Sequence, residues 1–416
     1  MSRRASAFLL CWLVAVPAAE AAVQAGAASE PFVLPAGVPL AGYSRRHGKP
    51  SHGTHDPVGA RALALSDDDT SAMLVSADVL IVDEPLFNAV RRRLGEAGLP
   101  GDLVLVLAAT HTHSGPGGYG RQFLEKISMG HYDPSVFDAL VEAIVRCGAR
   151  AWKARVPVRA ASGAAGAEGL VHNRVKEDGP VDASVTVTGF YPVDAQAPLA
   201  LVVSFAAHPT TLGASNMELS GDYPGALMRE LERRFPSATA LFFAGAAGDQ
   251  GPHKDGEGFE RPERLGAALA ERAASVVEGL RPEPFDHVRA AQAILTLPPA
   301  RVRAGSVTVP RWMGRRLVDD DATLALVIAG PTAFMGAPCD LATASLGARL
   351  KAAARERGLM PHIIGFASDY IGYCIPEAFY REHAYESSMA FNGPRAGELV
   401  TEKLIEMLDD QVRGER

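Results

Sequence analysis

Residues 103–119 read LVLVLAATHTHSGPGGY, an apolar run that passes directly into a pair of histidines. The five apolar residues from Leu103 to Leu107 predict a strand that is buried on both faces, because such strands carry no alternating polar side chains. On extended backbone, His111 and His113 place both imidazoles on the same side. One of them can bind a metal while the other faces a substrate, or both can bind. The sequence therefore predicts a ligand site with a metal where this strand ends.

The rest of the chain alternates apolar, strand-like runs with capped helical stretches. This pattern predicts the α/β (α+β) class, with mixed β-sheets flanked by helices. Asp83 with Pro85 begins one helix, and Asp133-Pro134 begins another. Further strands are predicted at 199–205, 240–243, 324–328 and 362–366, and further helices at 224–235, 262–280, 343–356 and 395–408. No linker divides the chain, so residues 22–416 are predicted to form one domain.

Composition excludes several classes of protein. Of the 416 residues, 47% are hydrophobic and 21% are charged, so the chain can bury a large core. The net charge of -7 offers no basic field for a nucleic-acid backbone, and we expect no nucleic-acid partner. Four cysteines in this length exclude a disulfide scaffold.

The first residues predict export. Arg3 and Arg4 precede an apolar run over residues 7–19, and Ala19-Glu20-Ala21 supplies a cleavage site. This is the pattern of a secretory signal peptide over residues 1–21. The run is too short to span a bilayer comfortably, and no later stretch is long and apolar enough to do so. We therefore expect a secreted or periplasmic protein without a membrane span.

Four further loops rich in His, Asp, Tyr or Gly also follow apolar strands. They contain His208 with Asp222, the run Gly248-Asp249-Gln250-Gly251, Asp340, and the segment 369–373. Side chains at strand ends of α/β folds converge on one crevice. The glycines of the second loop can form a nest of backbone N–H groups for an oxyanion.

Two neutral imidazoles and one carboxylate are a common ligand set of a catalytic zinc with one open position. Such a zinc lowers the pKa of its bound water and polarises a carbonyl group. His111, His208 and Asp340 could supply the set, and spacing alone does not choose Asp340 over Asp222 or Asp249.

At these residues the sequence resembles the catalytic domain of the neutral (non-lysosomal) ceramidase family. The matching blocks occur in order over nearly the whole chain after residue 21: Gly42-Tyr43, His55-Asp56-Pro57, residues 110–119, Asn173-Arg174, His208-Pro209-Thr210, Ser220-Gly221-Asp222, Gly248 to Pro252, Tyr370, Tyr373, Tyr385-Glu386 and Gly393-Pro394. The block at 110–119 is the most specific of them.

The resemblance implies a zinc-dependent amidase that cleaves the N-acyl bond of a sphingoid lipid. By position, His111 and His208 match the zinc-binding histidines, and Tyr373 matches a tyrosine ligand. Asp340 stands where the family has a glutamate ligand, in a Pro-Gly-Glu motif that here reads Pro338-Cys339-Asp340.

The resemblance also implies catalytic roles for three other residues. Tyr385 matches a second active-site tyrosine, and His113 and Arg174 match residues that hold the polar head of the substrate and the reacting carbonyl. With zinc bound, these three side chains would stabilise the oxyanion.

Three departures mark a distant member. The family's Gly-Asn-x-Ser-Pro loop, whose serine is a proposed nucleophile, reads Gly248-Asp249-Gln250-Gly251-Pro252, so a zinc-bound water is the remaining nucleophile. The family's larger members carry a C-terminal β-domain, and we expect none here because the chain ends at Arg416. The residues around His208 differ as well. Together the three departures weaken the expectation that ceramide itself is the substrate.

The sequence thus predicts a secreted zinc amidohydrolase with a lipid or small-molecule acyl substrate and peripheral membrane contact. An ester or lactone hydrolase on the same zinc centre is one alternative. A binding protein that kept the fold and lost turnover is another, and Gly251 supports it. Cys339 and Cys374 neighbour the proposed ligands Asp340 and Tyr373, and they either pair or remain buried thiols.

Overall fold

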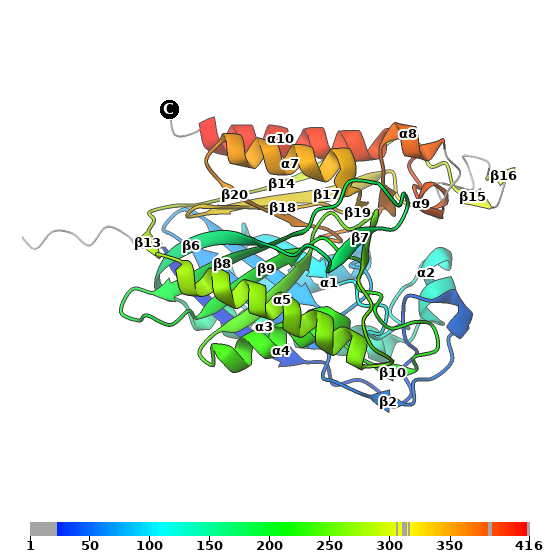
Figure 1. Cartoon of the computed structure of the whole chain (residues 1–416), viewed down its shortest axis with the longest axis horizontal. Helices are drawn as coiled ribbons and strands as arrows, with labels where there is room; N and C mark the ends of the chain where they lie inside the picture. The colour runs from blue at the N-terminus through cyan, green and yellow to red at the C-terminus, as the bar shows by residue number, and fades with distance from the viewer. Residues whose placement is uncertain (1–22, 305–306, 310–313, 315–316, 382–384, 414–416) are drawn as a thin grey trace, which may run out of the picture.

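Two β-sheets stacked face to face form the middle of the protein, and helices cover the outer face of each sheet (Figure 1). The computed structural model describes residues 23–304, 307–309, 314, 317–381 and 385–413. The predicted signal peptide, residues 1–21, lies outside the described residues. The mixed sheets flanked by helices confirm the predicted fold class.

The larger sheet has nine strands. Its order is β11 (Thr239–Ala244), β9 (Ala200–Phe205), β8 (Ser184–Pro192), β6 (Val156–Gly166), β1 (Gln24–Pro31), β3 (Gly59–Ser66), β4 (Ser71–Ala77) and β5 (Val104–Ala109), with β13 (Glu283–Pro284) paired to β6. Four helices pack on its outer face: α1 (Glu84–Glu96), α3 (Pro134–Lys153), α4 (Asp222–Arg234) and α5 (Glu260–Gly279).

The smaller sheet has four strands, in the order β14 (Val288–Thr296), β17 (Asp321–Ala329), β18 (Thr332–Gly336) and β20 (Met360–Ile364). Helices α7 (Ala348–Glu356) and α10 (Ala396–Arg413) cover it on the opposite side of the molecule from α3, α4 and α5 (Figure 1).

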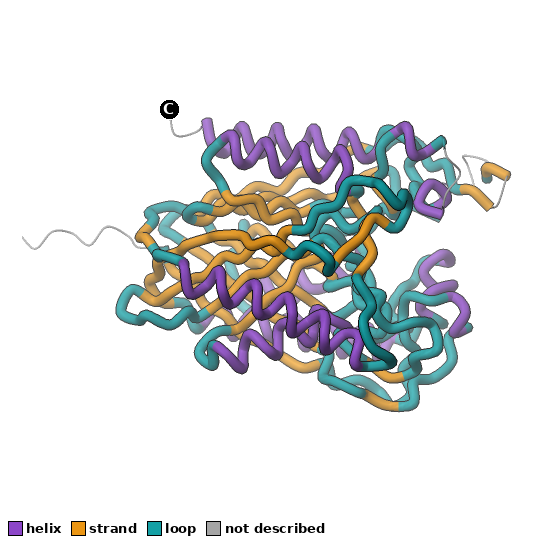
Figure 2. The backbone as a smooth tube through the Cα atoms, viewed as in Figure 1, coloured by secondary structure: helices purple, strands orange, loops and turns teal. Residues whose placement is uncertain are grey.

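Short elements connect these layers. The strand pairs are β2 (Gly53–Thr54) with β10 (Glu218–Leu219), β7 (Val171–Asn173) with β12 (Gln250–Pro252), β15 (Arg303–Ala304) with β16 (Val307–Thr308), and β19 (Asp340–Leu341) with β21 (Tyr373–Cys374). The short helices are η1 (Ser44–Arg46), α2 (Phe123–Met129), the π-helical turn η2 (Thr343–Gly347), α8 (Glu377–Tyr380) and α9 (Tyr385–Ser388). Connecting loops gather at the right-hand end of the molecule in Figure 2.

Strand β5 shows why the apolar run at 103–109 is continuous. Leu105 and Leu107 belong to the core between the larger sheet and its helices, together with Leu86 of α1. Val106 and Ala108 belong to the core between the two sheets. Because successive side chains of a strand point to opposite faces, both faces of β5 must be apolar.

The predicted helices and strands are present, with small differences at their ends. The carboxylates of Asp83 and Asp133 cap α1 and α3 by accepting hydrogen bonds from backbone N–H groups, as their positions before proline predicted. The helix predicted at 343–356 begins as a π-helical turn before α7, and the helix predicted at 395–408 continues to Arg413 as α10. Helix α2 was not predicted.

The larger sheet turns back on itself, and this brings distant strand ends together. β5 and β9 lie near opposite edges of the ladder. However, β1 and β6 join the two halves of the sheet through only two residue pairs. Beyond this junction, β11 packs against β4, where the Ser76 hydroxyl donates a buried 2.6 Å hydrogen bond to the Phe242 carbonyl. The loops after β5 and β9 therefore meet.

Among the described helices, none has both the length and the apolar composition that crossing a bilayer requires.

Gly26 tests the close packing of α3 on the larger sheet. A Cβ on this β1 residue would lie 2.3 Å from the Ala151 carbonyl oxygen of α3. We expect Gly26→Ala to lower the free energy of unfolding by roughly 1–3 kcal/mol, because the backbone of α3 must move to make room. Urea denaturation measures this change.

Gly95 of α1 provides the matched control, since none of the described residues outside its own stretch of helix lies within 4 Å of its Cβ position. Gly95→Ala should raise the free energy of unfolding by about 0.4–1 kcal/mol through the entropy of the unfolded chain. A Gly26→Ala variant as stable as the wild type would contradict the packing.

Candidate metal centre

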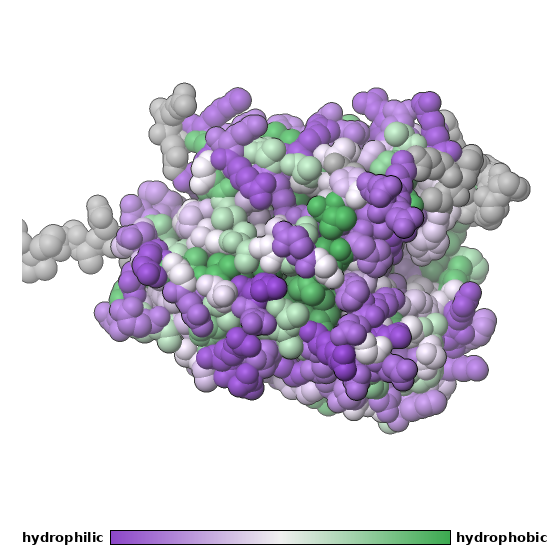
Figure 3. Space-filling model, in the orientation of Figure 1, coloured by the Kyte–Doolittle hydropathy of each residue, from purple (hydrophilic) through white to green (hydrophobic). Residues whose placement is uncertain are grey.

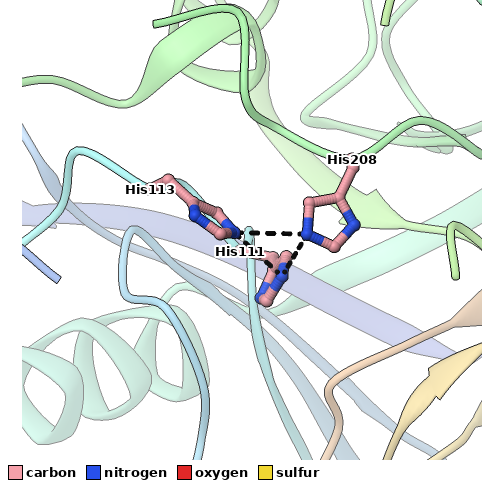
Figure 4. A group of neighbouring side chains, drawn as sticks. All are labelled: His111, His113 and His208. Atoms are coloured by element: carbon pink, nitrogen blue, oxygen red, sulfur yellow. Dashed lines mark hydrogen bonds between the residues drawn. The ribbon is translucent and has the colours of Figure 1, made fainter. Parts of the chain in front are cut away.

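Three histidines from two strand-end loops converge on one point (Figure 4). The Nε2 atom of His111 lies 3.0 Å from that of His208 and 3.3 Å from that of His113, and the last two are 3.2 Å apart. His111 and His113 follow β5, and His208 follows β9. The fold therefore brings His208 next to His111 and His113, three residues that the sequence predicted as site residues.

This nitrogen triangle has the dimensions of a metal site. At metal–nitrogen distances of about 2.0–2.1 Å, two ligands of a tetrahedral ion are about 3.3–3.4 Å apart. The Nδ1 atom of His111 lies 2.6 Å from the Leu80 carbonyl, which can only accept, so Nδ1 carries the proton and Nε2 presents a lone pair. Such a lone pair facing two other ring nitrogens fits a shared cation.

Burial keeps the three imidazoles neutral. It lowers the pKa of His111 to about 3, and it lowers the pKa values of His113 and His208 well below their ordinary value. The positive charge of Arg174 acts in the same direction on all three. Metals bind the neutral form of imidazole, so the site requires no deprotonation near neutral pH.

The backbone at His111 is unusual. Its φ of 63° is in the left-handed region, and its ring stacks on Phe366, with ring centroids 3.8 Å apart. Phe366 and Ser368 also have positive φ values, of 56° and 66°. Non-glycine residues in this conformation are costly and gather at functional sites, where the surrounding structure holds them.

His113 is held by two residues near the start of the chain. Gly42 has a φ of 103°, and a Cβ there would lie 2.6 Å from the His113 ring. The buried guanidinium of Arg46 donates to the carbonyls of His113, at 2.6 Å, and Ala41, at 2.7 Å. Arg46 was not predicted as a site residue, since its only signal in the sequence is its place just after the Gly42-Tyr43 block.

Asp340 lies beside His208 rather than in the nitrogen triangle. Its Oδ2 atom is 3.4 Å from Nδ1 of His208, which is a different ring nitrogen from the one in the triangle. Among the described His, Cys, Asp and Glu residues, these histidines are the only group of three or more whose ligand atoms all lie within 4.8 Å of one another. The Nε2 atom of His113, a residue predicted to face the substrate, thus belongs to the nitrogen triangle, whereas Asp340 lies behind His208.

Tyr373 and Arg174 lie next to Asp340. Asp340 and Tyr373 are directly paired in the parallel ladder of β19 and β21. Arg174 donates to the Tyr373 hydroxyl at 2.8 Å and lies 3.5 Å from Glu386. Burial alone would lower the pKa of Arg174, but the neighbouring Tyr373, Asp340 and Glu386 outweigh it and raise that pKa. Arg174 therefore remains a fixed cation.

The glycine-rich loop holds Arg174 in place. The Gly248 carbonyl accepts from the Arg174 side chain at 2.9 Å, and the Asp249 carbonyl accepts from the Arg174 backbone N–H at 2.9 Å. The Asp249 carboxylate accepts from the backbone N–H of Thr343, and the Gly248 N–H donates to Leu341. Gly251 lies in β12. The Gly248 N–H that the sequence analysis offered to an oxyanion is thus used within the fold.

Asp222, which spacing left open as a metal ligand, has hydrogen-bond partners within the fold. Its buried carboxylate accepts from the Thr211 hydroxyl and from the backbone N–H groups of Leu212 and Tyr223. Cys339 and Cys374, whose pairing the sequence also left open, are buried free thiols.

A cavity with an accessible volume of about 110 Å³ lies against the histidines. Of the predicted site residues, His111, His113, His208, Tyr373 and Tyr385 line it, whereas Arg174, Asp340, Gly248, Asp249 and Gly251 are not among its lining residues. Tyr385 is 63% exposed, and its ring contacts that of Tyr373 edge-on.

Helix α2 contributes part of the cavity wall and also presents apolar side chains to the surface. Phe123 and Ile127 are 66% and 50% exposed, and they belong to α2, where apolar side chains show at the right-hand edge of Figure 3.

Comparison with known proteins identifies similar chains. Residues 34–259 match the family model described as neutral/alkaline non-lysosomal ceramidase, N-terminal. The chain is 26% identical to a neutral ceramidase of Mycobacterium tuberculosis over 272 residues, which are 55% of this chain and 42% of that protein. It is 31% identical to a neutral ceramidase of Pseudomonas aeruginosa over 206 residues, 45% of this chain and 30% of the relative.

Solved structures share the fold. The crystal structure of neutral ceramidase from Pseudomonas aeruginosa superposes with a TM-score of 0.84 at 20% identity, covering 94% of this chain and 75% of the other. A ceramidase complexed with C2 gives a TM-score of 0.82 at 19% identity, with coverages of 93% and 75%.

Gly42→Ala should weaken metal binding, because the new methyl group displaces the His113 ring. We expect roughly a 10–100-fold loss of zinc affinity, the usual cost of disturbing groups that orient ligands. Competition with a chromophoric chelator measures it. Gly101→Ala is the control, since no described residue other than its two chain neighbours lies within 4 Å of its Cβ position. Equal affinity in the two variants would contradict a role for His113 in the metal site.

Asp340→Asn tests the carboxylate behind His208. Loss of its charge should reduce zinc affinity about 10–100-fold if it orients the ring, as carboxylates behind metal-bound histidines do. The same chelator competition applies, with the exposed Asp320→Asn as control. An unchanged affinity would show that Asp340 does not act on the metal site.

Proposed function

Because the chain belongs to the neutral/alkaline non-lysosomal ceramidase family, we propose that it is a zinc-dependent amidohydrolase. Its substrate class is an N-acyl lipid or a related acylated small molecule. The observation that carries the proposal is the triangle of three neutral imidazole nitrogens beside a cavity. Three such ligands leave one position of a tetrahedral ion open for chemistry.

We assign the zinc to the Nε2 atoms of His111, His113 and His208. Zinc bound there would lower the pKa of a bound water and polarise the scissile carbonyl. Asp340 and Tyr373, which the sequence analysis proposed as ligands, flank His208: Asp340 faces its Nδ1 atom, and the Tyr373 ring is nearly parallel to it, with ring centroids 6.5 Å apart. Their proposed role is to hold this ligand in position.

The proposed roles of Tyr385 and Arg174 depend on whether each residue lines the cavity. Tyr385 lines the cavity and is an exposed residue, so its hydroxyl can donate a hydrogen bond to a substrate oxygen. Arg174 is a positioning residue, since it donates to the Tyr373 hydroxyl and lies behind the cavity wall.

Gly251 supports water as the nucleophile, because glycine supplies no hydroxyl for an acyl intermediate. A Cβ at this position would lie 2.7 Å from Nε2 of His172 in the paired strand β7. The same glycine is the one observation that favours a binding protein without turnover, and the measurement of hydrolysis below separates the two.

The proposal also covers the substrate, the compartment in which the protein acts and the extent of the catalytic domain. The aligned region covers less than half of either curated relative, so their activity is not transferred directly. The signal-peptide pattern at residues 1–21 supports action outside the cytoplasm. We also propose that residues 22–416 act as one catalytic domain, because its site residues run from His111 to Tyr385.

The proposed function predicts one zinc per chain and metal-dependent amide hydrolysis. His111→Ala should lose bound zinc and lower kcat/KM on N-acyl substrates by roughly 10³-fold or more, because the metal supplies several kcal/mol of transition-state stabilisation. Elemental analysis and parallel panels of N-acyl amides and matched esters measure both.

His287→Ala is the matched control, because His287 is 73% exposed by side chain and lies outside the cavity. Full zinc content in His111→Ala would disprove the metal assignment. Hydrolysis of esters alone would favour the esterase or lactonase alternative, and zinc binding without any turnover would favour the binding protein.

A further inference from the structure

Five carboxylic acids line the same cavity as the histidines. This acidic group consists of Asp83, Glu84, Glu125, Asp319 and Asp369. Residues of two short helices line the cavity, Glu125 of α2 and Tyr385 of α9. Both helices lie at the right-hand end of the molecule in Figure 1. None of the described residues that line it is a lysine or an arginine.

The acids lie close to one another. Gln122 joins two of them, because its backbone N–H donates to Glu125 at 2.7 Å and its side chain donates to Asp319 at 3.3 Å. Burial, together with the facing charges of Glu125 and Asp369, raises the pKa of Asp83 to about 8. Burial likewise raises the pKa of Asp369 to about 7, with contributions from Asp319 and Glu84. Each acid therefore acts electrostatically on others in the group.

Asp83 has a buried oxygen without a partner. Its Oδ1 atom caps α1 by accepting from the Leu86 N–H at 3.0 Å. Its Oδ2 atom has no hydrogen-bond partner, although the residue is 4% exposed and lines the cavity. Among the described residues, no Lys, Arg or His lies within ion-pair distance of any of the five acids. A buried carboxylate without a partner is costly, so its presence indicates a ligand that supplies one.

The spacing of the acids favours an organic cation over a metal ion. Calcium binds oxygen at about 2.3–2.6 Å, so two ligands of one ion are at most about 5 Å apart. Among the described residues, no three of these acids have oxygens that all lie within 4.8 Å of one another; only the three histidines form a group this compact. A protonated amine can instead hydrogen-bond to separated carboxylates.

The other residues that line the cavity indicate that the rest of the ligand is apolar. They include the aliphatic side chains of Leu80, Ile81, Leu124, Leu317 and Val318. These would pack on a hydrocarbon stem while the acids hold its charged end.

We propose that the acidic group is a subsite for an alkylammonium group, so that the substrate is an N-acyl compound with a second, protonated amine on an aliphatic stem. This inference rests on the proposed function for the reaction, but the subsite is defined by its own residues. No bond is made or broken at it.

Asp83→Asn is the decisive variant, because asparagine keeps the cap on α1 and removes only the charge. The folded state raises the pKa of Asp83 above its unfolded value, so the charged form is disfavoured on folding and the wild type loses stability as the pH rises towards 8. Asp83→Asn should therefore melt no lower than the wild type at pH 8. Glu271→Gln on the exposed face of α5 is the matched charge control.

Binding is tested first, without any reaction. Hexylammonium chloride should raise the melting temperature of the full-length wild type and of Glu271→Gln, whereas hexan-1-ol should not. Asp83→Asn should lose this response. Equal shifts in melting temperature with hexylammonium and hexan-1-ol would overturn the subsite. A shift with calcium chloride but none with hexylammonium would overturn it as well.

Hydrolysis is tested second, with pairs of N-acyl substrates that differ only in a terminal ammonium or hydroxyl group. The wild type should prefer the ammonium member by roughly tenfold or more in kcat/KM, as expected for hydrogen bonds to charged groups. In Asp83→Asn the ratio should fall towards one. Equal kcat/KM values in the wild type would overturn the subsite and leave the proposed function intact. Hexylammonium binding without hydrolysis of any amide would overturn the proposed function and support the subsite.

Discussion

The return of the larger sheet on itself is the constraint on which the site depends. His111 and His208 follow strands near opposite edges of that sheet, and they meet only because its two halves are joined by two residue pairs. The hydrogen bond from Ser76 to Phe242 then ties β4 to β11 in the interior. A flat sheet of the same strands would leave the histidines far apart, since neighbouring strands are about 4.8 Å apart.

The cavity concentrates polar groups that are unfavourable for stability. His111 has a left-handed backbone, three imidazoles are kept neutral by burial, and Asp83 has an oxygen without a partner. Each feature is costly in isolation, and the close-packed layers on both sides supply the stability that tolerates it. A metal at the histidines and a cation at the acids would each remove part of that cost.

Several parts of the fold and site could be predicted from local sequence. The run at 103–107 predicted a doubly buried strand, and Asp83 and Asp133 before proline predicted helix starts that the structure confirms. Helix α2 was missed because its seven residues carry Phe123 and Ile127 on an exposed face, which hides the usual apolar periodicity. The role of Asp83 beyond capping was also missed, because a cap and a cavity-lining acid look alike in sequence.

The sequence by itself determined the fold class, the residue types of the candidate metal centre and their places after buried strands, because hydrophobic periodicity and capping act over a few residues. Tertiary structure alone decided which of those residues face one another. It placed His113 with His111 and His208, set Asp340 behind His208, and gathered acids from four separate segments into one cavity. These relations depend on a sheet junction and on the close approach of segments as far apart in the chain as Asp83 and Asp369, which no local pattern encodes.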